Sequence, residues 1–190
     1  VGNIDAKKAK PMIEKYLGSL ETVERTETFV DLGIRPPKGG IEKDVRRGKD
    51  DKCIEIIMFH GDFEYNAQNN TEIDAICKIL TTKLLEQIRE KESGVYSIGA
   101  YPMTSNKPTG RYGVQIFYSC DPAREPELKE KIFGVIKSIQ KGDISDDEIA
   151  KVIEKKKREH ETEVKENRYW RNLIVDLVEG DITPEEANGE

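Results

Sequence analysis

The run Cys53–His60, with the sequence CIEIIMFH, constrains the fold of this chain most strongly. It is almost continuously apolar, and it is short. Such a run suits a strand in the middle of a sheet better than a helix, because buried helices are usually longer. A strand of this kind needs neighbouring strands and covering helices, so we expect a fold that combines a sheet with helices.

The segments on either side of this run have the patterns of further strands and a helix. Thr71–Arg89 places apolar residues at helical spacing, which predicts a long amphipathic helix. Tyr96–Tyr101 and Tyr112–Cys120 are strand-like and are separated by the turn-rich sequence MTSNKPTGR. Ile41–Arg47 predicts another strand, joined to Cys53–His60 by the hairpin-like turn GKDD.

The N-terminus predicts one more strand and one more helix. VGNID is interpreted as the end of a buried strand that places Asp5 at the start of a helix, and Gly18 is expected to end that helix. The order of elements as far as Cys120 is therefore β-α-β-β-α-β-β. This order predicts an α+β two-layer sandwich with a largely antiparallel sheet. The chain begins with Val1 and not with Met, so we expect it to be a piece of a longer protein.

Helices are predicted for the rest of the chain. Leu128–Ile139 carries an apolar stripe, and Ser145 with Glu148 forms a capping box that starts a second helix. The charged segment Glu154–Glu166 mixes both signs and predicts a solvated helix. These extra helices are expected to cover one face of the sheet.

The length and composition fit one domain. We expect a single domain over 1–190, with a core at 1–142 and C-terminal helices at 143–190. The formal charge is -6 and the two signs are interspersed, which argues against nucleic acid as the main partner. No apolar run reaches about 18 residues, so no membrane span is expected. We expect a soluble chain, and the sequence does not distinguish a periplasmic from a cytoplasmic location.

Residues suited to a metal centre are sparse. The two histidines, His60 and His160, are far apart, and neither HExxH nor HxxEH occurs. The sequence HETE, at His160–Glu163, offers carboxylates but no second imidazole, so no zinc site is predicted in this chain.

Nucleophilic catalysis and a disulfide framework have equally little support. GxSxG and the phosphate-binding glycine patterns are absent. The three cysteines, Cys53, Cys77 and Cys120, are widely spaced and form no CxxC pair. Each is predicted to be a small core residue.

Arg89 and Tyr96 remain as candidates for chemistry, within the sequence LLEQIREKESGVYSIGAYP. Arg89 ends the predicted helix, and Tyr96 begins the predicted strand. A guanidinium is permanently charged, and a tyrosine hydroxyl is a donor at neutral pH, so together they can stabilise a carbonyl oxygen or an oxyanion. By residue type alone, the alternative is an Arg89 that complements the helix dipole and a Tyr96 that packs on the sheet.

These motifs, in this order, resemble the pitrilysin and insulinase type of zinc metallopeptidase, the HxxEH inverzincins. The resemblance rests on VGNID followed by a helix ending in YLGSL, on REKESGVYSIGAY, on RYGVQIFYSCDP and on NRYW. It implies a protein built from repeated domains, each with a β-α-β-β-α-β-β core. In such a protein, zinc and the catalytic Glu lie on the first domain, and a later domain supplies the Arg and Tyr across a closed chamber.

For this chain, the resemblance implies that Arg89 and Tyr96 contact the substrate backbone and help to stabilise the tetrahedral intermediate. HxxEH is missing, so the chain is expected to be a zinc-free C-terminal domain of a metalloendopeptidase, inactive alone, with zinc on a missing N-terminal domain. The expected partners are peptide substrate and the HxxEH-bearing half, in the same protein or in a partner subunit. A noncatalytic scaffold or assembly subunit of the same fold is the alternative.

Overall fold

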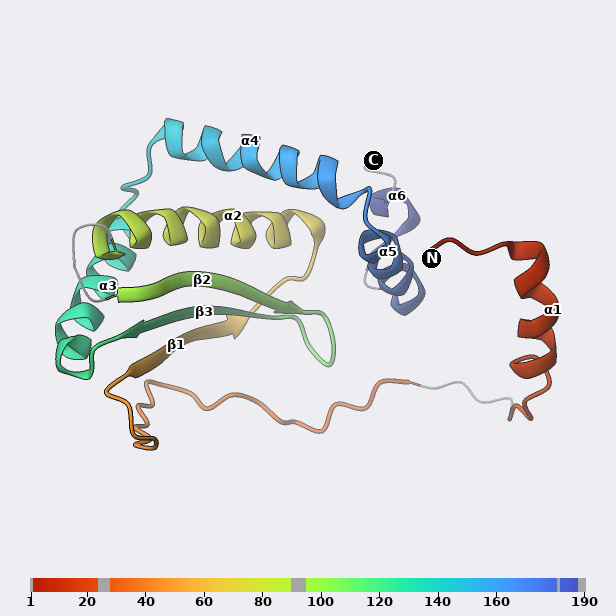
Figure 1. The fold of residues 1–190 in the computed structure, drawn as a ribbon, viewed down its shortest axis with the longest axis horizontal. Helices are drawn as coiled ribbons and strands as arrows, with labels where there is room; N and C mark the ends of the chain where they lie inside the picture. Colours follow the sequence, from red (N-terminus) through yellow and green to blue (C-terminus); the bar gives the residue numbers. More distant parts are fainter. Residues whose placement is uncertain (1, 24–27, 90–94, 181, 188–190) are drawn as a thin grey trace. The chain divides into compact units, whose positions relative to one another are not determined.

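The structure is a computed structural model, and it describes most of the chain (Figure 1). The described residues are 2–23, 28–89, 95–180 and 182–187. Two compact units are present. The larger unit spans Asp31–Lys157, and the smaller unit combines the residues up to Val30 with those from Arg158 onward. The expected division into a core at 1–142 and helices at 143–190 stays a prediction.

Three antiparallel strands form the sheet of the larger unit in the order β1-β3-β2. They are β1 (Cys53–Asp62), β2 (Val95–Ser105) and β3 (Arg111–Cys120). β1 and β3 pair in register along their whole length, beginning with Cys53 opposite Cys120. Strands are confirmed in these three parts of the sequence, each with wider bounds than predicted. The run Cys53–His60 was predicted to lie in the middle of a sheet, and this position is wrong for the described residues, where β1 is an edge strand.

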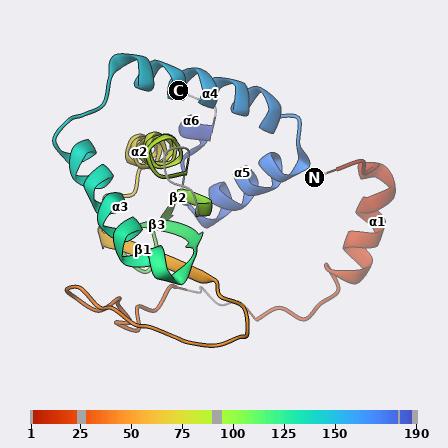
Figure 2. The same ribbon diagram turned by 60° about the vertical axis from the view of Figure 1, so that its left-hand side comes forward.

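One face of the sheet is covered by α2 (Ala67–Leu84) and α3 (Glu125–Gln140). Figure 1 shows α2 along the sheet, and Figure 2 views it end-on beside α3. Side chains of both helices, of the helical turn after α2, and of β2 and β3 form a single buried cluster, and partly buried side chains of β1 pack against it. Its members are Cys77, Leu80, Leu84, Ile88, Val95, Ile98, Ala100, Ile116, Tyr118, Cys120, Leu128, Ile132 and Val135. The predicted α+β two-layer architecture is therefore confirmed.

The opposite face of the sheet presents exposed apolar side chains. Successive residues of a strand point to opposite faces, so a strand that buries every second residue exposes the others. On β1, Ile54, Ile56 and Met58 are exposed, and on β2, Tyr101 and Met103 are exposed.

Two of the predicted strands are absent from the described residues. Ile41–Arg47 has no regular structure, and Ile41 and Val45 are both exposed. A short segment that buries no apolar side chain gains too little to offset the entropy lost on ordering. Gly2–Ile4 of VGNID is likewise not a strand, whereas Asp5 caps α1 (Ala6–Tyr16) as predicted.

The C-terminal helices follow the sequence prediction closely. They are α4 (Asp146–Glu163), α5 (Asn167–Glu179) and α6 (Pro184–Ala187). The capping box is formed: the Glu148 N–H donates to Ser145 Oγ at 3.2 Å, and the Ser145 N–H donates to Glu148 Oε2 at 2.8 Å. None of the residues 154–166 is buried, so the prediction of a solvated helix is confirmed.

Candidate functional site

Arg89 lies at the end of a π-helical turn, η1 (Leu85–Arg89), which continues α2. Leu84 and Ile88 are almost completely buried, and they anchor this turn in the core. The Arg89 side chain is exposed. Single π-helical turns are rare and occur frequently at functional sites, because they change the direction of the side chains that follow. The sequence predicted the end of the helix at Arg89 but not the change from α-helix to π-helix.

Tyr96 lies at an irregularity at the start of β2. Val95 pairs with Cys120 and Ser97 pairs with the preceding Ser119, so Tyr96 is an additional residue on its strand, as in a β-bulge. Val95 is buried, and Ser97 Oγ lies 3.1 Å from Ser119 Oγ. The Tyr96 side chain is 64% exposed. Most of the Tyr96 side chain is therefore accessible to solvent.

The end of this helix and the start of β2 lie at the same end of the sheet (Figure 1). The backbone thus brings the helical turn that carries Arg89 and the start of β2 that carries Tyr96 to one end of the sheet. Residues 90–94, which join them, lie outside the described residues. Two exposed hydrogen-bond donors, one of them cationic, are suited to stabilising a carbonyl oxygen or an oxyanion.

Side-chain bonds hold α2 against the neighbouring elements just before η1. Thr81 Oγ1 accepts from the Ala100 N–H of β2 at 2.9 Å and donates to the Ala100 carbonyl at 3.2 Å. Lys83 is buried, and its Nζ lies 2.9 Å from Glu148 Oε1 at the start of α4. The Ser145 N–H, together with Lys83, lowers the pKa of Glu148 to about 2. These contacts fix the helix that carries Arg89.

A cluster of carboxylates surrounds Lys129 of α3, and it was not predicted from the sequence. Lys129 Nζ lies 2.5 Å from Glu42, 3.2 Å from Glu55 and 3.2 Å from Glu125. The Tyr118 hydroxyl donates to Glu55 at 2.5 Å. The hydrogen bond with Glu55 raises the pKa of Glu125. Glu125 and Lys129 are four residues apart on α3, a spacing that the sequence could have indicated, whereas Glu42, Glu55 and Tyr118 come from distant segments that no sequence pattern groups with them.

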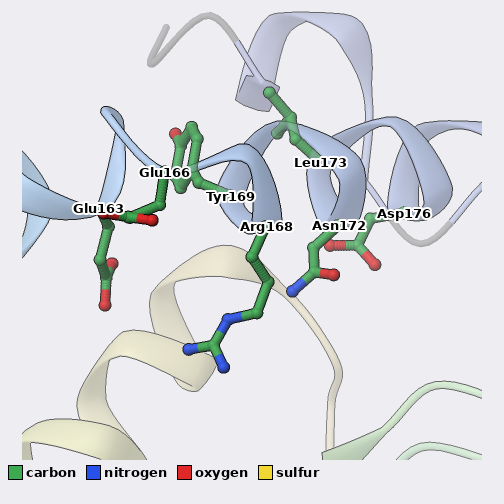
Figure 3. A pocket seen from close by; sticks show the side chains of 7 residues that line it. All are labelled: Glu163, Glu166, Arg168, Tyr169, Asn172, Leu173 and Asp176. Atoms are coloured by element: carbon green, nitrogen blue, oxygen red, sulfur yellow. The ribbon is translucent and has the colours of Figure 1, made fainter. Parts of the chain in front are cut away.

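A shallow cavity of about 590 Å³ lies in the smaller unit, against α5 (Figure 3). Figure 3 shows Arg168 and Asn172 extending from the same side of α5, as their spacing of four residues requires. Acidic side chains, Glu163, Glu166 and Asp176, form much of the remaining wall. No residue predicted to act in chemistry lines this cavity.

Comparison with known families assigns the chain to one of them. Its sequence matches the family described as "Peptidase M16 inactive domain" over residues 1–156, which is most of its length. The chain belongs to this family. The predicted resemblance to pitrilysin-type and insulinase-type peptidases is thereby confirmed.

Two relatives and one solved structure extend this result. The chain is 26% identical over 193 residues to "Zinc protease PQQL-like" of Arabidopsis thaliana, covering 92% of the chain. It is 26% identical over 192 residues to "Probable zinc protease PqqL" of Haemophilus influenzae, covering 94% of the chain. The crystal structure of the periplasmic protease PqqL from Escherichia coli superposes with a TM-score of 0.73 at 19% identity over 94% of the chain, which shows a common fold. The chain spans about a fifth (20%) of the length of each of these proteins.

The described part of this M16 inactive domain does not fit a zinc ion. It contains no group of three His, Cys, Asp or Glu residues that could hold a metal. His60 lies within β1. His160 lies on α4, and its ring packs edge-on against the ring of Tyr169, with the two ring centroids 5.6 Å apart. Among the helices of the described residues, none is long and apolar enough to cross a membrane.

Proposed function

We propose that this M16 inactive domain is the zinc-free C-terminal domain of a PqqL-like metalloendopeptidase. In this role it binds peptide substrate and supplies Arg89 and Tyr96 to stabilise the tetrahedral intermediate. The match to the family and the similarity to two proteins named as zinc proteases support the assignment to a peptidase. The zinc is assigned to another domain, on the N-terminal half of the same protein or on a partner subunit.

The proposal rests on the irregular backbone at the two candidate residues. Arg89 ends a π-helical turn, and Tyr96 occupies a bulge-like position. Both irregularities interrupt regular hydrogen bonding, and both are enriched near functional sites in proteins. In each case a buried neighbour, Ile88 or Val95, holds the backbone while the polar side chain is exposed. On this proposal, the arrangement presents two exposed donors at one end of the sheet, where a ligand can reach them.

The chemistry expected of these donors is electrostatic. When a peptide carbonyl is attacked, its oxygen acquires negative charge, so donors fixed around that oxygen bind the transition state more tightly than the substrate. The guanidinium of Arg89 offers a planar fork of N–H groups, and the Tyr96 hydroxyl offers one further donor. Neither group is a natural base at neutral pH, so both are assigned to binding oxygen atoms and not to proton abstraction.

The test uses the full-length protein that contains this chain. Arg89→Ala is expected to lower kcat on peptides by roughly a hundredfold to a thousandfold, the usual cost of losing a positioned donor. Arg89→Lys is expected to recover only part of this loss, because an ammonium lacks the planar fork. Arg46→Ala is the matched control, because Arg46 lies on the exposed irregular segment and its side chain is 91% exposed. Equal activity of Arg89→Ala and Arg46→Ala would contradict the assignment.

A noncatalytic scaffold or assembly subunit is the second candidate, because the description of the family as an inactive domain fits it equally well. The two candidate functions differ in the peptidase activity expected when this chain is mixed with the upstream half. Under the peptidase proposal, this chain alone cleaves no peptide, and it restores activity when combined with the separately folded upstream half that bears HxxEH. If the two halves associate and no peptide is cleaved, or if the upstream half lacks HxxEH, the scaffold is favoured.

A further inference from the structure

Cys53 and Cys120 are brought together by the pairing of β1 with β3. Cys53 is the first residue of β1, Cys120 is the last residue of β3, and the two lie directly opposite each other. Opposite residues of antiparallel strands have Cα atoms about 4.5–5.5 Å apart, which falls within the range of about 4.4–6.8 Å that a disulfide requires. Directly opposite residues point to the same face of the sheet; Cys120 belongs to the core cluster, and Cys53 packs against it. The thiols therefore already face each other.

The two thiols differ in access to solvent, and the third cysteine is separate from them. Cys120 is completely buried, whereas Cys53 is only partly buried, at the end of an edge strand. Cys77 lies on α2, is 1% exposed and is surrounded by apolar core residues. All three are free in the structure. A reagent from solvent therefore reaches Cys53 first, and the nearest second thiol is that of Cys120.

We propose that Cys53 and Cys120 are a redox-active pair that a low-molecular-weight disulfide oxidises to a disulfide between β1 and β3. The Cys53 thiolate attacks one sulfur of oxidised glutathione, breaking its S–S bond and releasing one glutathione thiolate. The Cys120 thiolate then attacks Cys53 Sγ of the mixed disulfide and releases the second glutathione thiolate. The protein loses two electrons and two protons, and one glutathione disulfide becomes two glutathione thiols.

The surroundings of the pair indicate that this exchange is slow at neutral pH. Burial, followed by the carboxylates of Glu125 and Glu55, raises the pKa of Cys53. Burial raises the pKa of Cys120 to about 11. Asp44 adds a smaller effect of the same sign on Cys53. Because only the thiolate is nucleophilic, we expect the rate of disulfide formation to rise as the pH is raised above neutral.

The disulfide would lie beside the candidate site. Cys120 is flanked by Cys53 of β1 on one side and by Val95 of β2 on the other, and Tyr96 follows Val95. A disulfide from Cys53 to Cys120 would join β1 covalently to the residue of β3 that pairs with Val95, next to the position from which Tyr96 projects. This inference rests on the register of β1 and β3 and does not depend on the proposed peptidase function.

The experiment counts thiols in the intact protein. The reduced protein is incubated with oxidised glutathione at mildly alkaline pH, then denatured and alkylated, and the disulfides are located by peptide mapping under non-reducing conditions. We expect this chain to fall from three free thiols to one, with Cys53 joined to Cys120 and Cys77 alkylated. Because the wild-type protein is mapped directly, the result does not depend on whether a variant folds.

Two variants sharpen the result. Cys77→Ala is expected to form the same disulfide and to retain no free thiol, whereas Cys53→Ser is expected to keep Cys77 and Cys120 both free. The proposal is overturned if the oxidised wild-type protein keeps three free thiols, if a stable glutathione adduct remains on Cys53, or if the mapped disulfide includes Cys77.

Discussion

The β1–β3 pair and the junction between α2 and β2 are built in opposite ways. β1 and β3 pair residue for residue without interruption, and the alternation of buried and exposed side chains along β1 follows from that regularity. At the junction, the helix ends in a π-helical turn and the strand begins with a register shift. The regular region buries apolar side chains and makes the core. The irregular region holds polar side chains, Arg89 and Tyr96, outside it, so departure from regularity marks the candidate site.

Removal of the buried anchor of the junction should have the largest effect on stability. Ile88 is 1% exposed within η1, so Ile88→Ala should lower the free energy of unfolding by about 2–5 kcal/mol through lost burial and a residual cavity. Ile54→Ala is the control on the regular strand, where the side chain is 58% exposed, and its effect should stay within about 0.5 kcal/mol. Urea unfolding of both variants measures the difference. Similar losses in the two variants would show that Ile88 does not anchor the junction.

Breaking the ion pair behind the junction should have a smaller effect that depends on pH. The pKa of Glu148 is lowered to about 2, below its ordinary value of 4.5. The contribution of its ionised form to stability is therefore present above pH 4.5 and is lost as the pH falls toward 2. Glu148→Gln should lower the free energy of unfolding at pH 7 by about 2 kcal/mol, because it leaves the buried Lys83 without its charged partner.

Measuring the free energy of unfolding of the Glu148→Gln variant across this pH range tests the direction of the predicted pH dependence. The difference from the wild-type protein should shrink as the pH is lowered from 4.5 toward 2. Glu161→Gln on the exposed part of α4 is the control and should change stability by less than about 0.5 kcal/mol at any pH. A Glu148→Gln effect that stays constant or grows on acidification would contradict the assigned ion pair.

Loss of the hydrogen bonds between Thr81 of α2 and Ala100 of β2 should have the smallest effect on stability. Thr81→Val keeps the shape of the side chain but removes the oxygen that bonds the N–H and the carbonyl of Ala100, which should lower the free energy of unfolding by about 1 kcal/mol. Thr82→Val is the matched control, because the exposed Thr82 hydroxyl donates only to the Lys78 carbonyl of its own helix. Amide hydrogen exchange at Ala100 should quicken in the first variant alone. Unchanged exchange there would show that Thr81 does not hold β2.

Regular elements were predictable because an apolar stripe or a short apolar run identifies each of them. The apolar stripe of Leu128–Ile139 and the run Cys53–His60 each bury a face, and the structure confirms both elements. The same reasoning failed for Ile41–Arg47, where Ile41 and Val45 remain exposed. Apolar residues that could share a face do not show that a neighbouring strand exists to pair with their segment.

The candidate site was only partly predictable. Residue types and the family resemblance identified Arg89 and Tyr96, but nothing in their sequence predicted a π-helical turn or a register shift, because both depend on how the helix and the strand meet the rest of the core. The contact between Cys53 and Cys120 was missed for a related reason. The register of two strands brings distant residues together, and the spacing of cysteines along the chain gives no information about it.

The activity of Tyr96→Phe in the full-length protein tests the central claim most directly, because the substitution removes one hydroxyl and keeps the ring. If Tyr96 donates to the developing oxyanion, kcat on peptides should fall roughly tenfold to a thousandfold, with zinc content and thermal stability unchanged. Tyr101→Phe, at the other exposed tyrosine of the same strand, should retain full turnover. Full turnover by Tyr96→Phe, or a deficit explained entirely by unfolding, would contradict the account and return Tyr96 to a purely structural role.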